Sequence, residues 1–188
     1  KDINKYHQQV NDFLAKFHHY VLPDYTNCTS IDKLLKSAGG AYHSKGLNSL
    51  KILPDDSFDL IYSQAVLEHV RRDEFSETIR QCRRLLKPNG VMSHVVDFKD
   101  HLGGGLNNLR ISSGLWEQNW FAFKSNFYTN RLRFSEVVKI CEDSGFTLKT
   151  AEVSRYEVTP IQREKLASEF SRLSDDDLSI SEVHLVMY

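Results

Sequence analysis

The chain has 188 residues, of which 40% are hydrophobic and 26% are charged, and its formal net charge is -1. This composition is typical of a globular protein large enough for one core. The small net charge excludes a broad nucleic-acid or anionic-membrane surface, and no apolar run approaches the ~20 residues that span a bilayer. We therefore expect one domain with no nucleic-acid and no membrane partner.

The cysteines are Cys28, Cys82 and Cys141, an odd number spread far apart along the chain. No Cys-x-x-Cys pair is present, which argues against a disulfide framework or a zinc site. The pattern predicts reduced thiols in a cytoplasmic protein.

The first part of the chain predicts two helices. Apolar residues recur every three or four positions from Ile3 to Val21, which is typical of an amphipathic helix. Ser30 is a good N-cap for a second, short helix over Ile31–Ser37. Residues 41–43 are expected to form a brief strand, followed by a loop over residues 44–50.

The stretch Leu53–Val70 reads Leu-Pro-Asp-Asp-Ser-Phe-Asp-Leu-Ile-Tyr-Ser-Gln-Ala-Val-Leu-Glu-His-Val. It predicts a polar turn, a short strand over Phe58–Tyr62, a break at Ser63-Gln64, and a helix-like run through Glu68-His69-Val70. A strand that stops at small polar residues and turns into a helix forms ligand crevices in open α/β sheets.

A strand-helix-strand unit follows. Asp73 is expected to cap a helix whose buried face carries Phe75, Ile79, Cys82 and Leu86. Leu-Lys-Pro-Asn-Gly at residues 86–90 stops that helix, with Gly90 expected at positive φ. A strand over residues 91–96 then pairs in parallel with the strand over residues 58–62.

The remainder begins with a long irregular connection over residues 97–130, a length typical of a lid or binding loop. Ser135 is expected to cap a helix over residues 136–144. A strand over residues 146–153, a helix opened by Thr159-Pro160 and a last strand over Glu182–Tyr188 complete the chain.

Two of these motifs carry a resemblance to a known family. Leu53–Val70 and the Leu-Lys-Pro-Asn-Gly turn resemble the class I S-adenosylmethionine-dependent methyltransferases with a type 11-like domain. The resemblance implies an α/β fold with a partial Rossmann-like sheet, mostly parallel with a last antiparallel strand, flanked by helices. It also implies S-adenosylmethionine as the cofactor and methyl transfer to a small-molecule acceptor.

The half of the family pattern that grips the cofactor is not found in this sequence. The family's first strand ends in a glycine-rich loop and its second in an acidic residue, but Gly39-Gly40 and Gly103–Gly105 do not follow apolar strands. We therefore expect residues 1–188 to form a single, N-terminally truncated domain. Each lost charge-assisted hydrogen bond removes about 1.5–3 kcal/mol, so weak or no cofactor binding is predicted. The alternatives are a non-catalytic methyltransferase-like binding domain and, more distantly, a metal-dependent hydrolase.

The resemblance assigns the cofactor-binding residues position by position. Leu47 and Asn48 fall where the family carries an Asp-Ala pair at the adenine, although the acid is missing here. Ser63, Gln64 and Ala65 fall where the family's fourth strand meets the methionyl sulfur region.

Catalytic and substrate-binding residues are expected at the carboxyl ends of the two parallel strands. His69, Asp97 and His101 are the candidates for a catalytic base. The candidates for substrate contacts are Asp100, Asn130 and Arg131. No metal site is expected, because strand alternation places His94 and Asp97 on opposite faces of the sheet.

The strand over residues 58–62 would pair with the family's first strand, so we expect it to present an open apolar edge here. Such an edge favours a homodimer.

Overall fold

The computed structural model describes residues 28–188. The chain divides into two compact units, residues 1–45 and 46–188, and each is described by itself. In the first unit, helix α2 (Ile31–Ser37) begins where expected, because the Ser30 hydroxyl accepts a hydrogen bond from the Lys33 N–H. Residues 41–43 form no strand, since they pair with no strand among the described residues. The predicted helix over Ile3–Val21 lies outside the described residues.

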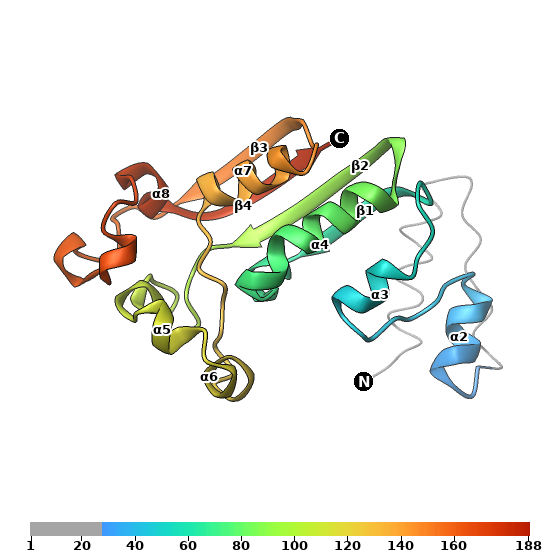
Figure 1. Cartoon of the computed structure of the whole chain (residues 1–188), viewed down its shortest axis with the longest axis horizontal. Helices are drawn as coiled ribbons and strands as arrows, with labels where there is room; N and C mark the ends of the chain where they lie inside the picture. Colours follow the sequence, from blue (N-terminus) through green and yellow to red (C-terminus); the bar gives the residue numbers. More distant parts are fainter. Residues whose placement is uncertain (1–27) are drawn as a thin grey trace. The chain divides into compact units, whose positions relative to one another are not determined.

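The second unit alternates strands and helices (Figure 1). Its elements are α3 (Leu47–Lys51), β1 (Phe58–Gln64), η1 (Leu67–His69), α4 (Arg72–Leu85), β2 (Leu86–Asp97), η2 (Asn107–Arg110), α5 (Ser113–Trp116), α6 (Asn119–Lys124), α7 (Phe134–Asp143), β3 (Leu148–Arg155), η3 (Arg163–Lys165), η4 (Ser168–Phe170), α8 (Asp175–Ser179) and β4 (Ile180–Met187). The helix α3 replaces part of the loop expected over residues 44–50. No helix of residues 28–188 is long and apolar enough to cross a membrane.

The four strands form one sheet in the order β1-β2-β4-β3. β1 and β2 are parallel, and β4 is antiparallel to both β2 and β3. Three strands therefore run in one direction and β4 runs against them. The predicted sheet, mostly parallel with a last antiparallel strand and flanked by helices, is confirmed.

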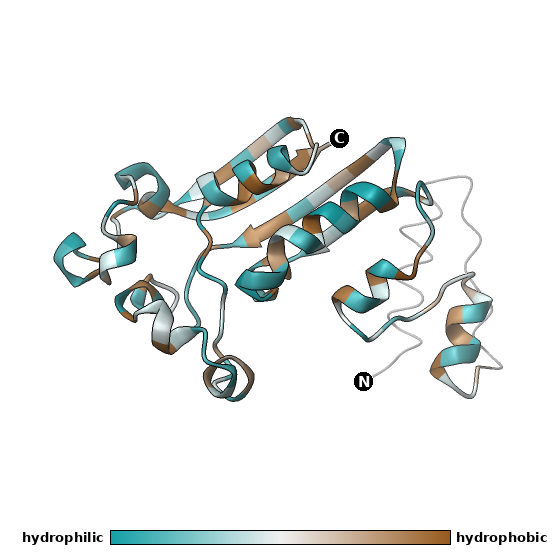
Figure 2. Cartoon of the chain, in the orientation of Figure 1, coloured by the Kyte–Doolittle hydropathy of each residue, from teal (hydrophilic) through white to brown (hydrophobic). Residues whose placement is uncertain are grey.

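Helices α4 and α7 lie over the same face of the sheet and bury the main core (Figure 1). In this core the predicted buried face of α4, with Phe75, Ile79 and Cys82, meets Val137 and Cys141 of α7. Figure 2 shows the outward side of α4 as mainly hydrophilic and β2 as mainly hydrophobic. Burial raises the pKa of Cys82 to about 11 and that of Cys141 to about 12, so both thiols stay neutral.

The Lys-Pro-Asn-Gly turn appears as a bulge in β2. Phe58 pairs with Leu86 and Leu60 with Val91, so two steps along β1 span five along β2. Gly90 does not have a positive φ, so the prediction of a positive φ at this residue is wrong. Glycine is needed here for space, because a Cβ would lie 2.8 Å from Leu86 Cδ2 and 3.0 Å from the Phe58 carbonyl oxygen.

The start of α4 differs from the sequence prediction. The residue before the helix is Arg71, and Asp73 lies inside the first turn, so the predicted cap is wrong. The reason is tertiary: the Arg72 N–H, one of the unpaired donors of a helix start, donates to the Tyr128 hydroxyl at 3.3 Å.

Helix α7 also begins before its predicted cap. The Glu136 carboxylate accepts from the Arg133 N–H at 3.1 Å, and the Ser135 N–H donates to the Asp177 carboxylate at 3.0 Å. Ser135 therefore lies within the helix instead of preceding it.

The helix predicted at Thr159-Pro160 is wrong as well. This segment forms turns and the short helices η3 and η4. The Arg163 guanidinium donates to the carbonyls of Ser171 and Leu173, each at 2.9 Å. These bonds close residues 163–173 into a loop in place of a continuous helix.

Strand β1 lies at one edge of the sheet. Within residues 28–188 it pairs with β2 alone, and Phe58, Leu60 and Tyr62 are exposed along it. The open apolar edge is present in this part of the chain, while the homodimer stays a prediction.

Candidate functional site

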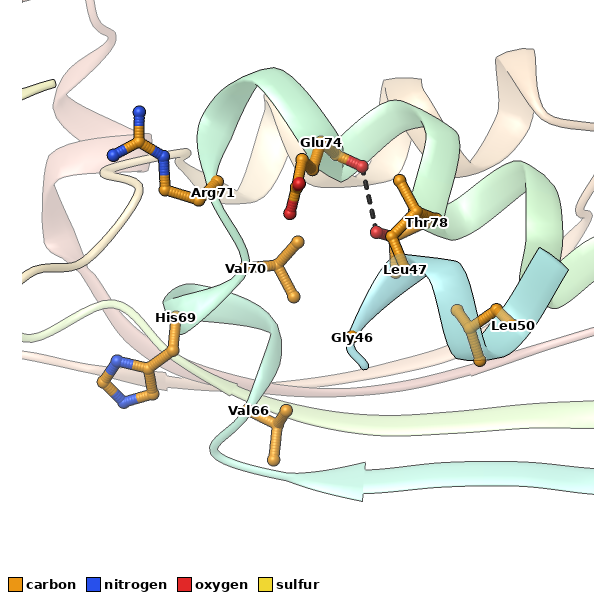
Figure 3. A pocket seen from close by; sticks show the side chains of 9 residues that line it. All are labelled: Gly46, Leu47, Leu50, Val66, His69, Val70, Arg71, Glu74 and Thr78. Carbon is orange, nitrogen blue, oxygen red and sulfur yellow. Dashed lines mark hydrogen bonds between the residues drawn. The ribbon is translucent and has the colours of Figure 1, made fainter. Parts of the chain in front are cut away.

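A pocket of about 400 Å³ opens beside the carboxyl end of β1 (Figure 3). Its walls come from the start of α3, the turn after β1 and the first turns of α4. The lining residues are Gly46, Leu47, Leu50, Val66, His69, Val70, Arg71, Glu74 and Thr78. Four aliphatic side chains and one carboxylate give it the mixed character of a small-molecule site.

The turn after β1 is shaped by two hydrogen bonds to β2. The Ala65 N–H donates to the Val95 carbonyl at 2.9 Å, and Ala65 takes φ of 50°, which is uncommon for a residue with a Cβ. The Ser63 hydroxyl lies 2.6 Å from His94 Nδ1, on the core side of the sheet. These contacts turn the chain sharply and bring Val66 to the pocket.

Not all predicted cofactor residues reach this pocket. Leu47 lines it, whereas Asn48, Ser63, Gln64 and Ala65 are not among its lining residues. Asn48, Gln64 and Ala65 are exposed. Their roles stay predictions.

Asn130 holds the short helix η1 in place. Its side-chain amide donates to the Leu67 carbonyl at 2.8 Å and to the Val70 carbonyl at 2.9 Å, and its backbone N–H donates to the Glu68 carbonyl at 2.7 Å. Asn130 is almost fully buried. Its observed contacts are thus with the backbone that carries His69, and the predicted substrate contact stays a prediction.

His69 presents one ring nitrogen as a base. Its Nδ1 lies 3.2 Å from the Tyr128 carbonyl, which can only accept, so Nδ1 carries the proton and Nε2 the lone pair. The side chain is 43% exposed. The His101 ring lies 5.0 Å from the His69 ring, centroid to centroid. The structure thus brings together two of the three predicted catalytic residues.

Glu68 is a buried acid beside this histidine. Its Oε1 lies 3.9 Å from His69 Nε2, and its Oε2 has no hydrogen-bond partner. Burial raises the pKa of the Glu68 carboxyl above its usual range, and the Asp97 carboxylate acts in the same direction, while a backbone N–H and His69 oppose it. The sequence motif Leu-Glu-His could have pointed to Glu68, but its burial depends on tertiary packing.

The two predicted aspartates build the loop after β2. Asp97 accepts from the Lys99 N–H at 2.8 Å and lies 2.9 Å from Lys99 Nζ. Asp100 is buried, and its carboxylate accepts four backbone N–H groups, those of Leu102, Gly104, Gly105 and Asn107. Direct roles in catalysis or substrate binding stay predictions for both.

Arg131 is buried as part of the packing of the 98–133 connection. Its guanidinium lies between the rings of Trp116 and Phe170, 4.9 and 4.8 Å from their centroids. Its Nη2 donates to the Ser113 hydroxyl at 2.9 Å. The predicted substrate contact stays a prediction for this residue too.

Sequence reasoning missed several residues of the site, among them Val66, Arg71 and Tyr128. Val66 and Arg71 flank the predicted motif positions and line the pocket, and Tyr128 contacts both His69 and Arg72. The position of Val66 could have been read from the strand-to-helix break, but that of Tyr128 could not. Among residues 28–188, no group of three or more His, Cys, Asp or Glu could hold a metal ion.

Residues 13–93 match a family model described as a methyltransferase domain. The resemblance to class I S-adenosylmethionine-dependent methyltransferases is confirmed. The matched range ends in β2 and contains the whole stretch from Leu53 to Val70, together with the pocket-lining residues of this methyltransferase-like chain. No curated protein matches the chain.

Two solved structures that are similar to this chain are named as S-adenosylmethionine dependent methyltransferases. One is an S-adenosylmethionine dependent methyltransferase from Mesorhizobium loti, with 20% identity over 83% of this chain and 76% of that chain and a TM-score of 0.45. Another is a SAM dependent methyltransferase from Archaeoglobus fulgidus, with 12% identity, coverage of 83% and 70%, and a TM-score of 0.47.

The pocket fits one part of S-adenosylmethionine. The aliphatic walls at Leu47, Leu50 and Val66 suit the adenine ring, and the Glu74 carboxylate is an acceptor suited to a hydroxyl. The glycine-rich turn Gly103–Gly105 lies between β2 and η2, but the Gly104 and Gly105 N–H groups donate to the Asp100 carboxylate and are not free for the methionyl carboxylate. The described residues therefore fit the nucleoside half of the cofactor.

Proposed function

We propose that this chain is the acceptor-side part of a cytoplasmic methyltransferase that moves a methyl group from S-adenosylmethionine to a small molecule. The observation that carries the proposal is the pocket at the carboxyl end of β1, which joins Leu47 and Val66 to His69 at its rim. That end of a parallel strand is where open α/β sheets bind ligands.

Each residue has a defined role in the proposed reaction. S-adenosylmethionine, when bound, supplies an electrophilic methyl group. Leu47 and Val66 flank the nucleoside, and Asn130 fixes the turn that carries His69. His69 Nε2 accepts the proton that the acceptor's nucleophile loses, because Nδ1–H is committed to the Tyr128 carbonyl. Positioning of the acceptor supplies most of the rate enhancement.

Cofactor binding tests the proposal directly. Methyl NMR signals of Leu47 and Val66 are expected to shift when S-adenosylmethionine is added to the purified chain. A millimolar dissociation constant corresponds to about -4 kcal/mol, and we expect affinity in that weak range, since only the nucleoside half fits. A low-micromolar constant would contradict the predicted weakness, although it would support the function.

Two matched variants locate the binding. Val66→Arg places a bulky cation in the pocket at a half-exposed position and is expected to abolish the shifts. Val158→Arg changes a more exposed valine outside this pocket and is expected to leave them unchanged. Equal effects of the two variants, or no shift in the unmodified chain, would favour the non-catalytic alternative.

A further inference from the structure

Arg71 lies where two pockets meet. It lines the pocket beside β1, and it also lines a second pocket of about 390 Å³ with Arg72, Asp73 and Glu117. Figure 3 shows its guanidinium and the His69 ring pointing to the same side, away from Leu47. The arginine head group is therefore on the same side of the turn as the proposed base.

One end of the Arg71 guanidinium is unpaired. Nη2 donates to the Glu117 carbonyl at 3.2 Å, and Nε lies 3.5 Å from the Asp73 carboxylate. Nη1 is buried and has no hydrogen-bond partner. The guanidinium carbon lies 5.7 Å from the Phe123 ring centroid and 5.6 Å from that of Tyr128. A rigid donor fork with a free Nη and aromatic neighbours suits oxyanion recognition.

Two buried arginines, Arg131 and Arg133, and the half-buried Arg72 use their Nη atoms inside the protein. Both Nη atoms of Arg72, Arg131 and Arg133 donate hydrogen bonds, mostly to backbone carbonyls. In Arg131 and Arg133 the unpaired atom is Nε. Of the buried arginine Nη atoms in residues 28–188, Arg71 Nη1 is the one left without a partner.

The carboxylates nearby do not take this donor. Glu117 Oε2 accepts from the Tyr128 hydroxyl at 2.7 Å, and Glu117 Oε1, which has no hydrogen-bond partner, lies 3.6 Å from Arg131 Nη2. Asp73 has a side chain that is 73% exposed, and it approaches Nε instead. An unpaired buried charged donor carries a desolvation cost that a bound anion would remove.

We propose that Arg71 binds a carboxylate or phosphate group of the methyl acceptor. The inference rests on the proposed function, because it names the chemical class of the acceptor at the same site. The oxyanion would receive hydrogen bonds from Nη1, and the acceptor's nucleophile would then lie on the side of His69. An acceptor held at one end in this way has less freedom to lose when it reacts.

The test uses two anions and no cofactor. Benzoate and phenyl phosphate are titrated separately into the isotopically labelled chain, while the Arg71 guanidinium NMR signals are recorded. At least one anion is expected to shift these signals with saturation, and the stronger of the two identifies carboxylate or phosphate. Absence of a saturable shift with both anions would overturn the proposal.

Three variants give the assignment. Arg71→Gln is expected to weaken binding of the preferred anion at least tenfold, measured by calorimetry, and Arg71→Lys to weaken it less, because the charge stays and the fork is lost. Arg110→Gln removes an exposed guanidinium that lines neither of these pockets and is expected to bind normally. Equal affinity of Arg71→Gln and the unmodified chain would refute the assignment.

Two further readouts distinguish failure of the Arg71 site from failure of the cofactor pocket. If Arg71→Gln does not fold, Arg71→Lys decides, and a folded lysine variant with unchanged affinity for both anions would contradict the need for a fork. Anion binding without any cofactor-induced shift at Val66 would count against the proposed function alone. Cofactor shifts without anion binding would count against the Arg71 site alone.

Discussion

Replacing His94 should change how the stability of the chain depends on pH. His94 is 2% exposed, its Nδ1 contacts the Ser63 hydroxyl, and its Nε2 has no hydrogen-bond partner. Burial lowers the pKa of His94 from 6.5 to about 4. Protonation would place an unpaired charge in the core, so the folded state keeps the ring neutral.

The sign and size of the effect follow from this shift. Between pH 6.5 and 4 the unfolded chain binds a proton at His94 that the folded chain does not, so stability falls as pH falls. A shift of roughly 2.5 pKa units at 1.36 kcal/mol per unit corresponds to about 3 kcal/mol. Because the ring is buried and little solvent screens it, we expect most of this change to appear in the measured free energy of unfolding.

Urea unfolding of the unmodified chain and of His94→Gln, at half-unit steps from pH 7.5 to 4, measures the effect. The free energy of unfolding of the unmodified chain, relative to the variant, is expected to fall by about 3 kcal/mol over this range. Met92→Leu, at a non-titrating core position of the same strand, is the control and should show a constant difference. A constant difference for His94→Gln as well would refute the reasoning.

Three other predictions concern the frame of the site. Gly90→Ala should lower the free energy of unfolding in urea by about 1–3 kcal/mol, because there is no space for its Cβ. Gly114→Ala is the control and should leave this free energy unchanged, because a Cβ there has no atom within 4 Å. Asn130→Ala should lower the free energy of unfolding by about 2–5 kcal/mol, because it leaves two carbonyls unpaired. A melting temperature within about 1 °C of that of the unmodified chain would contradict this. The chain should form homodimers through the exposed β1 edge, and the double variant Leu60→Lys, Tyr62→Lys should be monomeric. A monodisperse monomer of the unmodified chain in light scattering would count against this prediction.

The sequence was most informative where one element determines its own structure. The apolar spacing in α4 identified Phe75, Ile79 and Cys82 as buried. The polar break was predicted two residues early, because Ser63 and Gln64 are the last residues of β1 and the chain turns at Ala65. Both signals depend on neighbouring residues in the chain, so they can be interpreted without knowledge of the tertiary fold.

Helix starts could not be predicted in the same way. Asp73 and Ser135 are good caps by residue type, yet α4 and α7 each begin earlier. The Arg72 N–H is paired by Tyr128, 56 residues away, and the Ser135 N–H by Asp177, 42 residues away. A distant hydroxyl or carboxylate replaces the local cap, and single-sequence propensity does not include such partners.

Arg71 and Arg131 differ for the same physical reason. In the sequence both are arginines beside polar residues, and Arg131 was the one expected to bind substrate. In the structure the Nη atoms of Arg131 donate hydrogen bonds within the 98–133 connection, whereas Arg71 Nη1 has no hydrogen-bond partner. Binding capacity thus depends on which donors the fold leaves unpaired, and that is decided by contacts between segments far apart in the chain. A cationic residue near a motif is therefore a candidate only once its internal partners have been counted.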